Sequence, residues 1–375
     1  MVHIRSLFFD GPLAEVESQV SRATKEIGVG EVIWSITNKC NLLCKHCYVG
    51  AHSKSDIGEL SDRETIELIH KIGQAGIPLL FITGGEPLLR QNLFDILSIA
   101  NYYGMRTVLS TNAVLINREN AKRLKLLGVD YVALSIYGRK EFHDEYVKVP
   151  GTFEKIVKNI KVLQEEDIGL CIKTTVNSEI FPNLSFILNF AKNVGARLIY
   201  PCDMITSGRA TKLIGQRVLN TDWYQFAEIL LQEVIADEQG LEFDIGAHPS
   251  VAFYIAERLR EMGYDVEKAF QRLSELNACH VGKGIMAINA KGDVIPCNFI
   301  QNYTVGNIRD ISIKEAIHQL QKIGAQKVKG YCGSCKFVDL CRGCRAKALL
   351  EYNDILEQDP SCLLKNPSKA KSCHC

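Results

Sequence analysis

Between residues 31 and 202, short apolar stretches rich in β-branched residues alternate with segments of helical periodicity, and this alternation restricts the fold most strongly. The strand candidates are residues 31–37, 79–83, 106–111, 131–137, 170–176 and 197–202. The helix candidates between them are residues 62–74, 92–103, 118–127, 152–166 and 184–193. Such alternation predicts a parallel sheet covered by helices. Six units fall short of a closed eight-fold barrel, so we expect an α/β fold with an open, partial (β/α)6 parallel barrel.

Three cysteines follow the first strand candidate directly. Cys40, Cys44 and Cys47 are separated by three and by two residues. A cubic iron–sulfur cluster normally takes four cysteine ligands, so a loop with three thiolates would leave one iron open for another ligand. The same spacing is also compatible with a zinc loop or with chance. The cysteines alone therefore predict a metal site and leave the metal open.

A glycine-rich loop, Thr-Gly-Gly-Glu-Pro at residues 83–87, follows the second strand candidate. Gly84 and Gly85 would let the backbone approach a ligand closely. Glu86 could accept a hydrogen bond from an ammonium group. Considered alone, these residues are better explained as an ordinary turn.

Polar side chains also stand at the ends of the later strand candidates. The candidate cofactor contacts there are Ser110, Asn112, Ser135 and Lys173. Arg209 follows the sixth strand candidate, and its guanidinium would suit a carboxylate of a cofactor or of a substrate. A solvated loop arginine is the plain alternative. Because the carboxyl ends of parallel strands meet along one edge, these motifs predict one shared site.

The chain holds 14 cysteines, and most of them lie in its last third. The candidate metal ligands in this part are Cys279, Cys297, Cys332, Cys335, Cys341, Cys344 and Cys362. Their number exceeds that of one tetrahedral zinc site, which favours iron and sulfur over a zinc ribbon. The tail residues Cys373, His374 and Cys375 could supply a missing ligand or belong to a disordered tail. Cys171 and Cys202 are expected to be core thiols on apolar strands, and the alternative for Cys202, near a strand end, is that it lines a pocket.

Together the N-terminal motifs resemble the radical S-adenosylmethionine (radical SAM) superfamily. The resemblance rests on the three spaced cysteines, on the ring of His46 before the last of them, and on the Gly-Gly-Glu-Pro loop that ends at Pro87. It implies that the cysteines hold a 4Fe–4S cluster whose open iron binds SAM, and that residues 84–87 and the polar strand ends contact SAM. Tyr137 stands where many members have an aspartate, so no carboxylate contact is expected there.

The C-terminal cysteines resemble the SPASM domain, a small cysteine-rich domain with auxiliary iron–sulfur clusters. The resemblance implies one auxiliary cluster on Cys332, Cys335, Cys341 and Cys362. It also implies that Cys279, Cys297 and Cys344 contribute to a second, inner cluster. Two residues rather than the common three precede Cys344, and a cysteine that many members carry between Cys279 and Cys297 is missing. The inner cluster would therefore have three ligands and an open iron, or be absent with Cys344 serving a single auxiliary cluster.

The resemblance implies an enzyme that reductively cleaves SAM to methionine and a 5′-deoxyadenosyl radical, which takes a hydrogen atom from the substrate. Residues 341–348 and 357–362 look most like a branch of haem-biosynthesis enzymes, with maturases of ribosomally made peptides close to it. We therefore expect modification of a tetrapyrrole side chain, with peptide or protein maturation as the alternative. A non-catalytic iron–sulfur electron carrier or a zinc-stabilised binding module needs no SAM pocket, and the glycine loop argues against both.

The resemblance also implies protein partners. A reductant such as ferredoxin or flavodoxin would deliver electrons. Residues 1–30 are too short for a peptide-binding domain, so a peptide maturase would need a separate peptide-recruiting protein.

Composition sets the remaining expectations. A chain of 375 residues with 46% hydrophobic residues is typical of a globular protein with more than one domain. Its net charge of +1 and lack of a basic block argue against a nucleic-acid partner. No apolar run is long enough for a membrane span and no signal peptide is evident, so a cytoplasmic protein is expected. The predicted divisions are a lead-in (1–30), a radical SAM core (31–220), a helical bridge (221–276), a SPASM-like domain (277–365) and a tail (366–375).

Overall fold

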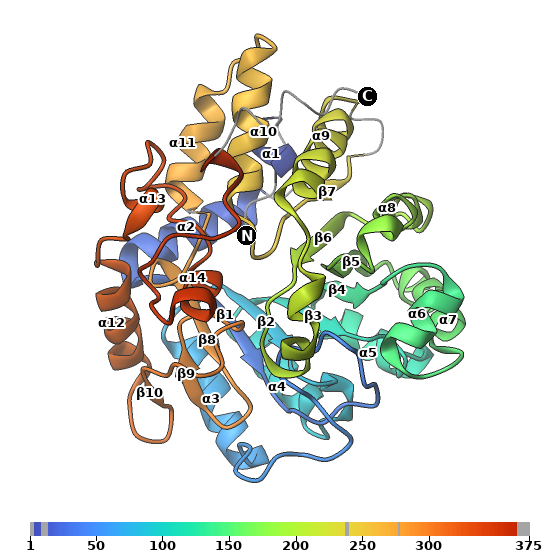
Figure 1. The fold of residues 1–375 in the computed structure, drawn as a ribbon. Coiled ribbons are helices and arrows are strands. Elements are labelled where there is room, and N and C mark those ends of the chain that lie inside the picture. The colour runs from blue at the N-terminus through green and yellow to red at the C-terminus, as the bar shows by residue number, and fades with distance from the viewer. Residues whose placement is uncertain (1–3, 9–13, 237–239, 277, 366–375) are drawn as a thin grey trace.

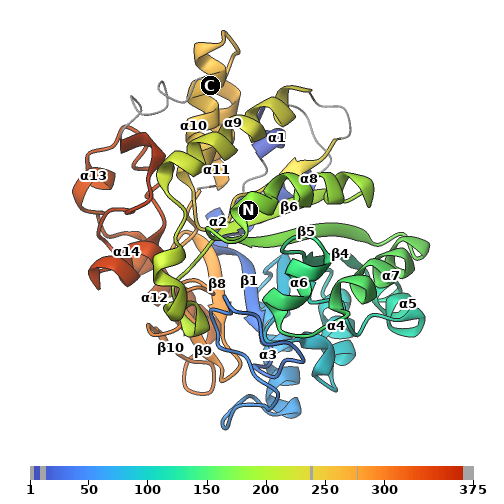
Figure 2. The same ribbon diagram turned by 45° about the vertical axis from the view of Figure 1, so that its right-hand side comes forward.

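The computed structural model describes residues 4–8, 14–236, 240–276 and 278–365 (Figure 1). The tail candidates Cys373, His374 and Cys375 lie outside these residues. Within the described part, one ten-stranded sheet runs in the order β10-β9-β8-β1-β2-β3-β4-β5-β6-β7. Helices α3 to α8 lie outside the central strands, and the two views in Figures 1 and 2 show the C-terminal part beside β8 and β1.

The central strands are the six that the sequence predicts. They are β1 (Val29–Ser35), β2 (Leu79–Thr83), β3 (Arg106–Thr111), β4 (Val129–Ser135), β5 (Gly169–Val176) and β6 (Leu198–Asp203). The predicted helices are α3 (Asp62–Gln74), α4 (Leu93–Tyr102), α5 (Arg118–Leu126), α7 (Thr152–Glu165) and α8 (Leu184–Asn193). Each neighbouring pair from β1 to β6 is parallel, which confirms the expected α/β barrel. Helix α6 (Lys140–Val147), between β4 and α7, was not predicted.

The parallel sheet continues beyond these six strands at both edges. At one edge β7 (Glu242–Phe243) pairs in parallel with β6. At the other, β8 (Gly284–Ile288) pairs in parallel with β1, and β9 (Asp293–Ile295) pairs antiparallel with β8. Strands β8 and β9 therefore form a hairpin whose first strand is also hydrogen-bonded to the barrel. The cysteine-rich part thus begins within the barrel sheet.

Three helices form the segment between β6 and β8. They are α9 (Asn220–Ala236), α10 (Ser250–Glu261) and α11 (Glu267–Leu276). The stretch 249–276 looks like one long helix in sequence but is broken after α10, where Gly263 has a φ of +91°. Glycine adopts this conformation without the steric cost that other residues incur, so the chain can turn there.

Helix α2 (Ala14–Ile27) closes the amino-terminal end of the barrel. Val20 packs in a buried cluster with Leu79 and Leu198, the first residues of β2 and β6, and with Val108 of β3. A Cβ at Gly30 would collide with the backbone oxygen of Val20, so helix and strand lie in close contact. The lead-in, which the sequence left without a role, therefore seals the floor of the barrel and leaves the carboxyl ends open.

The C-terminal part packs beside the barrel as short elements joined by cysteine-bearing loops. These elements are β10 (Gly306–Asn307), α12 (Ile313–Gly324), α13 (Gly330–Gly333), α14 (Arg345–Tyr352) and the short helix η4 (Leu363–Lys365). Arg309, after β10, donates to Glu64 of α3. None of the helices in the described residues has the length and apolarity needed to span a bilayer.

Candidate functional site

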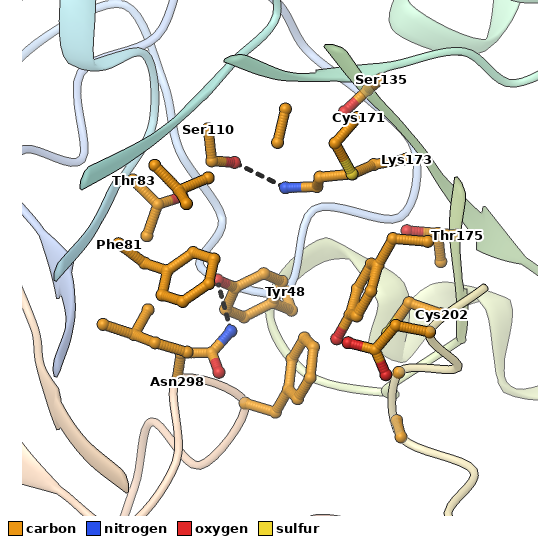
Figure 3. A pocket seen from close by; sticks show the side chains of 18 of the residues that line it. Tyr48, Phe81, Thr83, Ser110, Ser135, Cys171, Lys173, Thr175, Cys202 and Asn298 are labelled. Carbon is orange, nitrogen blue, oxygen red and sulfur yellow. Dashed lines mark hydrogen bonds between the residues drawn. The ribbon is translucent and has the colours of Figure 1, made fainter. Parts of the chain in front are cut away.

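A cavity of about 380 Å³ occupies the inside of the barrel. Its wall is made by inward-facing side chains of β1 to β6, by the loop that carries Cys40, Cys44 and Cys47, and by residues of the C-terminal part. Figure 3 shows the side chains of Ser110, Ser135, Lys173, Thr175 and Cys202 around this space. The expectation that the strand-end motifs meet in one place is fulfilled.

The cysteine loop is held by backbone hydrogen bonds from several elements. The Cys40 N–H donates to the His52 carbonyl at 2.7 Å, and the Leu42 N–H donates to the Cys40 sulfur at 3.4 Å. Amide donors of this kind stabilise a thiolate. Burial raises the pKa of the Cys40 thiol to about 11 and raises that of Cys44 as well. The protein environment alone therefore keeps these thiols protonated, and a bound metal would have to displace their protons.

Arg209 fastens the same loop from the segment after β6. Its backbone N–H donates to the Cys47 carbonyl at 2.9 Å, and its Nε donates to the Cys44 carbonyl at 2.9 Å. One terminal nitrogen also donates to the Ala51 carbonyl. Arg209 is thus not the solvated arginine that the sequence allowed. Its guanidinium positions the cysteine loop, and the residue also lines the cavity.

The two loop glycines allow another close backbone approach. A Cβ on Gly84 would collide with the Thr37 carbonyl, and one on Gly85 would collide with the Lys39 carbonyl. The Gly85 N–H donates to Thr37 at 2.6 Å, and the Glu86 N–H donates to Lys39 at 2.8 Å. Both glycines line the cavity. Because they lack a Cβ, both glycines let this loop pack directly against the cysteine loop. Their backbone also faces the cavity.

Glu86 and Pro87 differ from expectation, because neither lines the cavity. The Glu86 carboxylate is fully buried and accepts hydrogen bonds from Leu88 N–H at 3.0 Å, Thr111 Oγ1 at 2.7 Å and Asn112 N–H at 2.8 Å. Burial raises its pKa while these bonds lower it. The expected side-chain contact with an ammonium group is replaced by an internal brace, and Pro87 begins the short helix η1 (Pro87–Leu89).

Lys173 and the serines stand at the strand ends as predicted. Lys173 Nζ donates to Ser110 Oγ at 2.5 Å, and Ser135 lies on the strand between them (Figure 3). Burial lowers the pKa of Lys173. Asn112 donates to Asn41 Oδ1 at 2.7 Å, within the cysteine loop. These residues surround the part of the cavity nearest the three cysteines.

His46 has a packing role. It is buried, and its ring lies 4.7 Å from that of Tyr137 and 5.2 Å from that of Tyr146, measured between centroids. Burial lowers the pKa of His46 to about 3. The neutral imidazole therefore supports the loop between Cys44 and Cys47 from behind.

The C-terminal cysteines fall into two groups. Cys279, Cys297 and Cys344 line the barrel cavity, whereas Cys332, Cys335, Cys341 and Cys362 do not. In the outer group the Asp359 N–H donates to the Cys332 sulfur at 3.3 Å, and the Phe337 N–H donates to the Cys335 sulfur at 3.5 Å. The cavity thus separates the same two groups of cysteines that the resemblance implies, and their ligation of two clusters stays a prediction.

Three comparisons with known proteins bear on this site. Residues 34–183 match the model of the Radical SAM superfamily, and residues 279–345 match that of the SPASM iron-sulfur cluster-binding domain. The AdoMet-dependent heme synthase of Oleidesulfovibrio alaskensis is 30% identical over 339 residues, which are 88% of this chain and 86% of the relative. The chain belongs to the radical SAM superfamily. It is an enzyme whose cofactors are iron–sulfur clusters and SAM.

Two further proteins are similar to this radical SAM enzyme over most of its length. The mycofactocin maturase MftC of Mycobacterium tuberculosis is 26% identical, over 91% of this chain and 85% of the relative. The solved structure of Streptococcus suis SuiB bound to S-adenosylmethionine has a TM-score of 0.72 at 17% identity, over 93% of this chain and 81% of SuiB. At that identity the likeness to SuiB shows the shared fold alone.

The residues of the radical SAM enzyme fit the cofactors of its superfamily. Three thiols on one loop face a cavity, a backbone amide points at one of their sulfurs, and a glycine loop closes on them. Among the described residues, no three His, Cys, Asp or Glu side chains converge as they would around one metal ion.

His248 and His280 are both largely buried, although the sequence around them looks like exposed loops in which neither has a clear partner. His248 Nδ1 lies 3.2 Å from Ser250 Oγ, and its ring packs on Trp223. His280 Nδ1 lies 3.1 Å from Glu31 Oε1, on the cavity wall.

Tyr48 is a cavity residue of the radical SAM enzyme that sequence reasoning missed. Its hydroxyl accepts a hydrogen bond from Asn298 at 3.2 Å, so it joins the cysteine loop to the neighbour of Cys297 (Figure 3). Its position directly after Cys47 was the available signal. Cys202 lines the cavity, which is the alternative that its place near a strand end left open.

Proposed function

We propose that this radical SAM enzyme modifies a side chain of a tetrapyrrole. The observation that carries the proposal is the match to a relative named for heme synthesis, which spans 88% of this chain at 30% identity. The maturase relative covers a similar share at 26%. The cavity supports the proposal because it lies between the cysteine loop and the inner C-terminal cysteines, where a substrate would be screened from water.

We infer that the polar strand ends bind SAM. Lys173 is a half-buried cation that donates to the neutral Ser110 hydroxyl, and a ligand carboxylate would compensate its charge. The carboxylate of SAM has the right charge for this position, while Ser135 and Asn112 offer hydroxyl and amide groups for its sugar and amino acid parts. The backbone of Gly84 and Gly85 completes this part of the wall.

The chain's own residues prepare the reaction. When bound, the cluster on Cys40, Cys44 and Cys47 would supply the electron that cleaves SAM. Arg209 holds the loop that carries these thiols, and Glu86 braces the loop facing it. We propose that ferredoxin or flavodoxin provides the electron, in the cytoplasm, where the free thiols of the described cysteines would stay reduced.

The proposal is tested with the anaerobically reconstituted enzyme, dithionite and SAM. A panel of iron porphyrins with propionate side chains is compared with candidate peptides encoded near the gene. We expect one porphyrin to be consumed with formation of 5′-deoxyadenosine, detected by chromatography and mass spectrometry. Deoxyadenosine formation that no porphyrin stimulates, with a peptide modified instead, would overturn the tetrapyrrole proposal.

Peptide maturation remains the second candidate because the maturase relative spans 91% of this chain. This function would require a separate protein that recruits the peptide. A modified peptide mass that appears only when such a protein is added would identify it.

A further inference from the structure

The inner group of C-terminal cysteines is one thiolate short of a complete ligand set. Cys279, Cys297 and Cys344 all line the barrel cavity. A fully protein-bound 4Fe–4S cluster takes four cysteines. The outer group already contains four, namely Cys332, Cys335, Cys341 and Cys362. A further cysteine near the inner group would therefore complete it.

Cys202 occupies such a position. It lies near the carboxyl end of β6, and its side chain lines the same cavity as the three inner cysteines. The backbone of Gly246 runs beside it, since a Cβ at Gly246 would come within 2.8 Å of the Cys202 sulfur. In Figure 3, Cys202 stands beside Thr175, whereas Cys171 lies near Lys173 and Ser135. Cys202 thus faces the C-terminal side of the cavity.

A buried ion pair joins the strand end of Cys202 to the helix that follows Cys344. Lys347 of α14 donates to Asp203, the residue after Cys202, and both side chains are about nine-tenths buried. Cys344 is the N-cap of α14, and its N–H donates to Asp359 at 2.7 Å. The position of Cys344 relative to Cys202 is therefore fixed from both sides.

The three inner cysteines also pack together beside the end of β6. Cys344 is buried in a cluster against which Cys279 and Cys297 pack, and Ile205, two residues after Asp203, belongs to the same cluster. Ala247 packs against it too, directly after Gly246, whose backbone runs beside the Cys202 sulfur. The segments that flank Cys202 are thus in contact with the inner cysteines.

We propose that Cys202 of the barrel is the fourth ligand of an inner iron–sulfur cluster, together with Cys279, Cys297 and Cys344. The cluster would then be held by both parts of the chain. It would lie on the cavity wall, with Tyr48 and Asn298 between it and the loop of Cys47. The proposal concerns metal content alone, so it stands or falls independently of the substrate.

The test uses the full chain in which Cys40, Cys44 and Cys47 are replaced by alanine, so that only auxiliary clusters load. After anaerobic reconstitution, this parent should hold about eight irons, taking about four per cluster. Cys202→Ala should reduce the content to about four, as Cys344→Ala does, with loss of one of two signals in the electron paramagnetic resonance spectrum of the reduced protein. Cys202→Ser, which nearly keeps the volume, should shift the g values of that same signal.

Cys171→Ala is the matched control, because Cys171 is also a buried thiol on a barrel strand and lines the cavity, but near Lys173 and Ser135 (Figure 3). It should keep about eight irons and both signals. The proposal is overturned if Cys202→Ala keeps the iron and an unchanged spectrum. A parent that loads only about four irons would overturn it equally, since no inner cluster would exist.

Discussion

At the scale of single residues, buried polar groups hold the two loops of the site in place. Glu86 accepts two backbone N–H groups and one hydroxyl, each on a different residue. Arg209 donates to carbonyls of the cysteine loop. When a buried side chain makes several hydrogen bonds, even a substitution of similar shape leaves at least one buried partner without its hydrogen bond.

Glu86→Gln should destabilise the protein by about 1–3 kcal/mol, because an amide nitrogen in place of either oxygen would face a backbone N–H of Leu88 or Asn112. SAM cleavage should fall with it. Urea unfolding under anaerobic conditions measures the first effect and deoxyadenosine formation the second. Glu67→Gln, on the exposed face of α3, is the control. Lost SAM cleavage at unchanged stability would instead indicate a direct contact between Glu86 and SAM.

Lys173→Met should raise the SAM concentration for half-maximal cleavage by about 10- to 100-fold. This is the loss of affinity expected when one charge-assisted hydrogen bond is removed. The measurement is substrate-free deoxyadenosine formation against SAM concentration. Lys140→Met removes an exposed cation paired with Glu154 and should leave the curve unchanged. An unaltered half-saturation in the Lys173 variant would show that this cation does not hold SAM.

At the scale of elements, the sequence predicts the helices and strands themselves. It does not predict contacts between elements that lie far apart in the chain. The six central strands and five helices lie within two residues of prediction because their apolar periodicity is strong. The pairing of β8 with β1 was not predictable, since the apolar run Gly284–Ile288 fits either a separate hairpin or the barrel edge. The direction of the Glu86 side chain was not predictable either, because it depends on hydrogen bonds from Thr111 and Asn112, at the end of β3.

Helix α2 provides a test at this scale. Gly30→Ala should destabilise the protein by about 1–3 kcal/mol, because the added methyl group would be forced against the backbone of Val20 in α2. Gly215→Ala, where a Cβ meets nothing within 4 Å, is the matched control. Equal unfolding midpoints in urea for the two variants would mean that α2 is not pressed against β1.

At the scale of the whole molecule, the barrel and the cysteine-rich part share one sheet and one cavity. Strand β8 continues the barrel sheet, and Lys347 of α14 reaches Asp203 at the end of β6. A buried ion pair of this kind contributes little net stability but is costly to break from one side. The Asp203–Lys347 pair fixes the position of the inner cysteines relative to the barrel.

Asp203→Asn should cost about 3–5 kcal/mol, because it leaves the Lys347 ammonium buried without its counter-charge. The double variant Asp203→Asn, Lys347→Met should recover part of this loss in urea unfolding. Arg217→Met breaks the half-exposed pair with Glu351, which also ties α14 to the segment after β6, and should cost less than about 1 kcal/mol. Equal losses for both pairs would show that the Asp203 pair is solvated in solution.

The most direct test of the proposed function follows a hydrogen atom. A tetrapyrrole deuterated on its propionate side chains is turned over anaerobically with SAM and dithionite, and the mass of the 5′-deoxyadenosine is measured. We expect deuterium in the deoxyadenosine, and no deoxyadenosine from the variant in which Cys40, Cys44 and Cys47 are alanine. Deoxyadenosine that forms without deuterium, while the tetrapyrrole remains unchanged, would contradict a tetrapyrrole substrate.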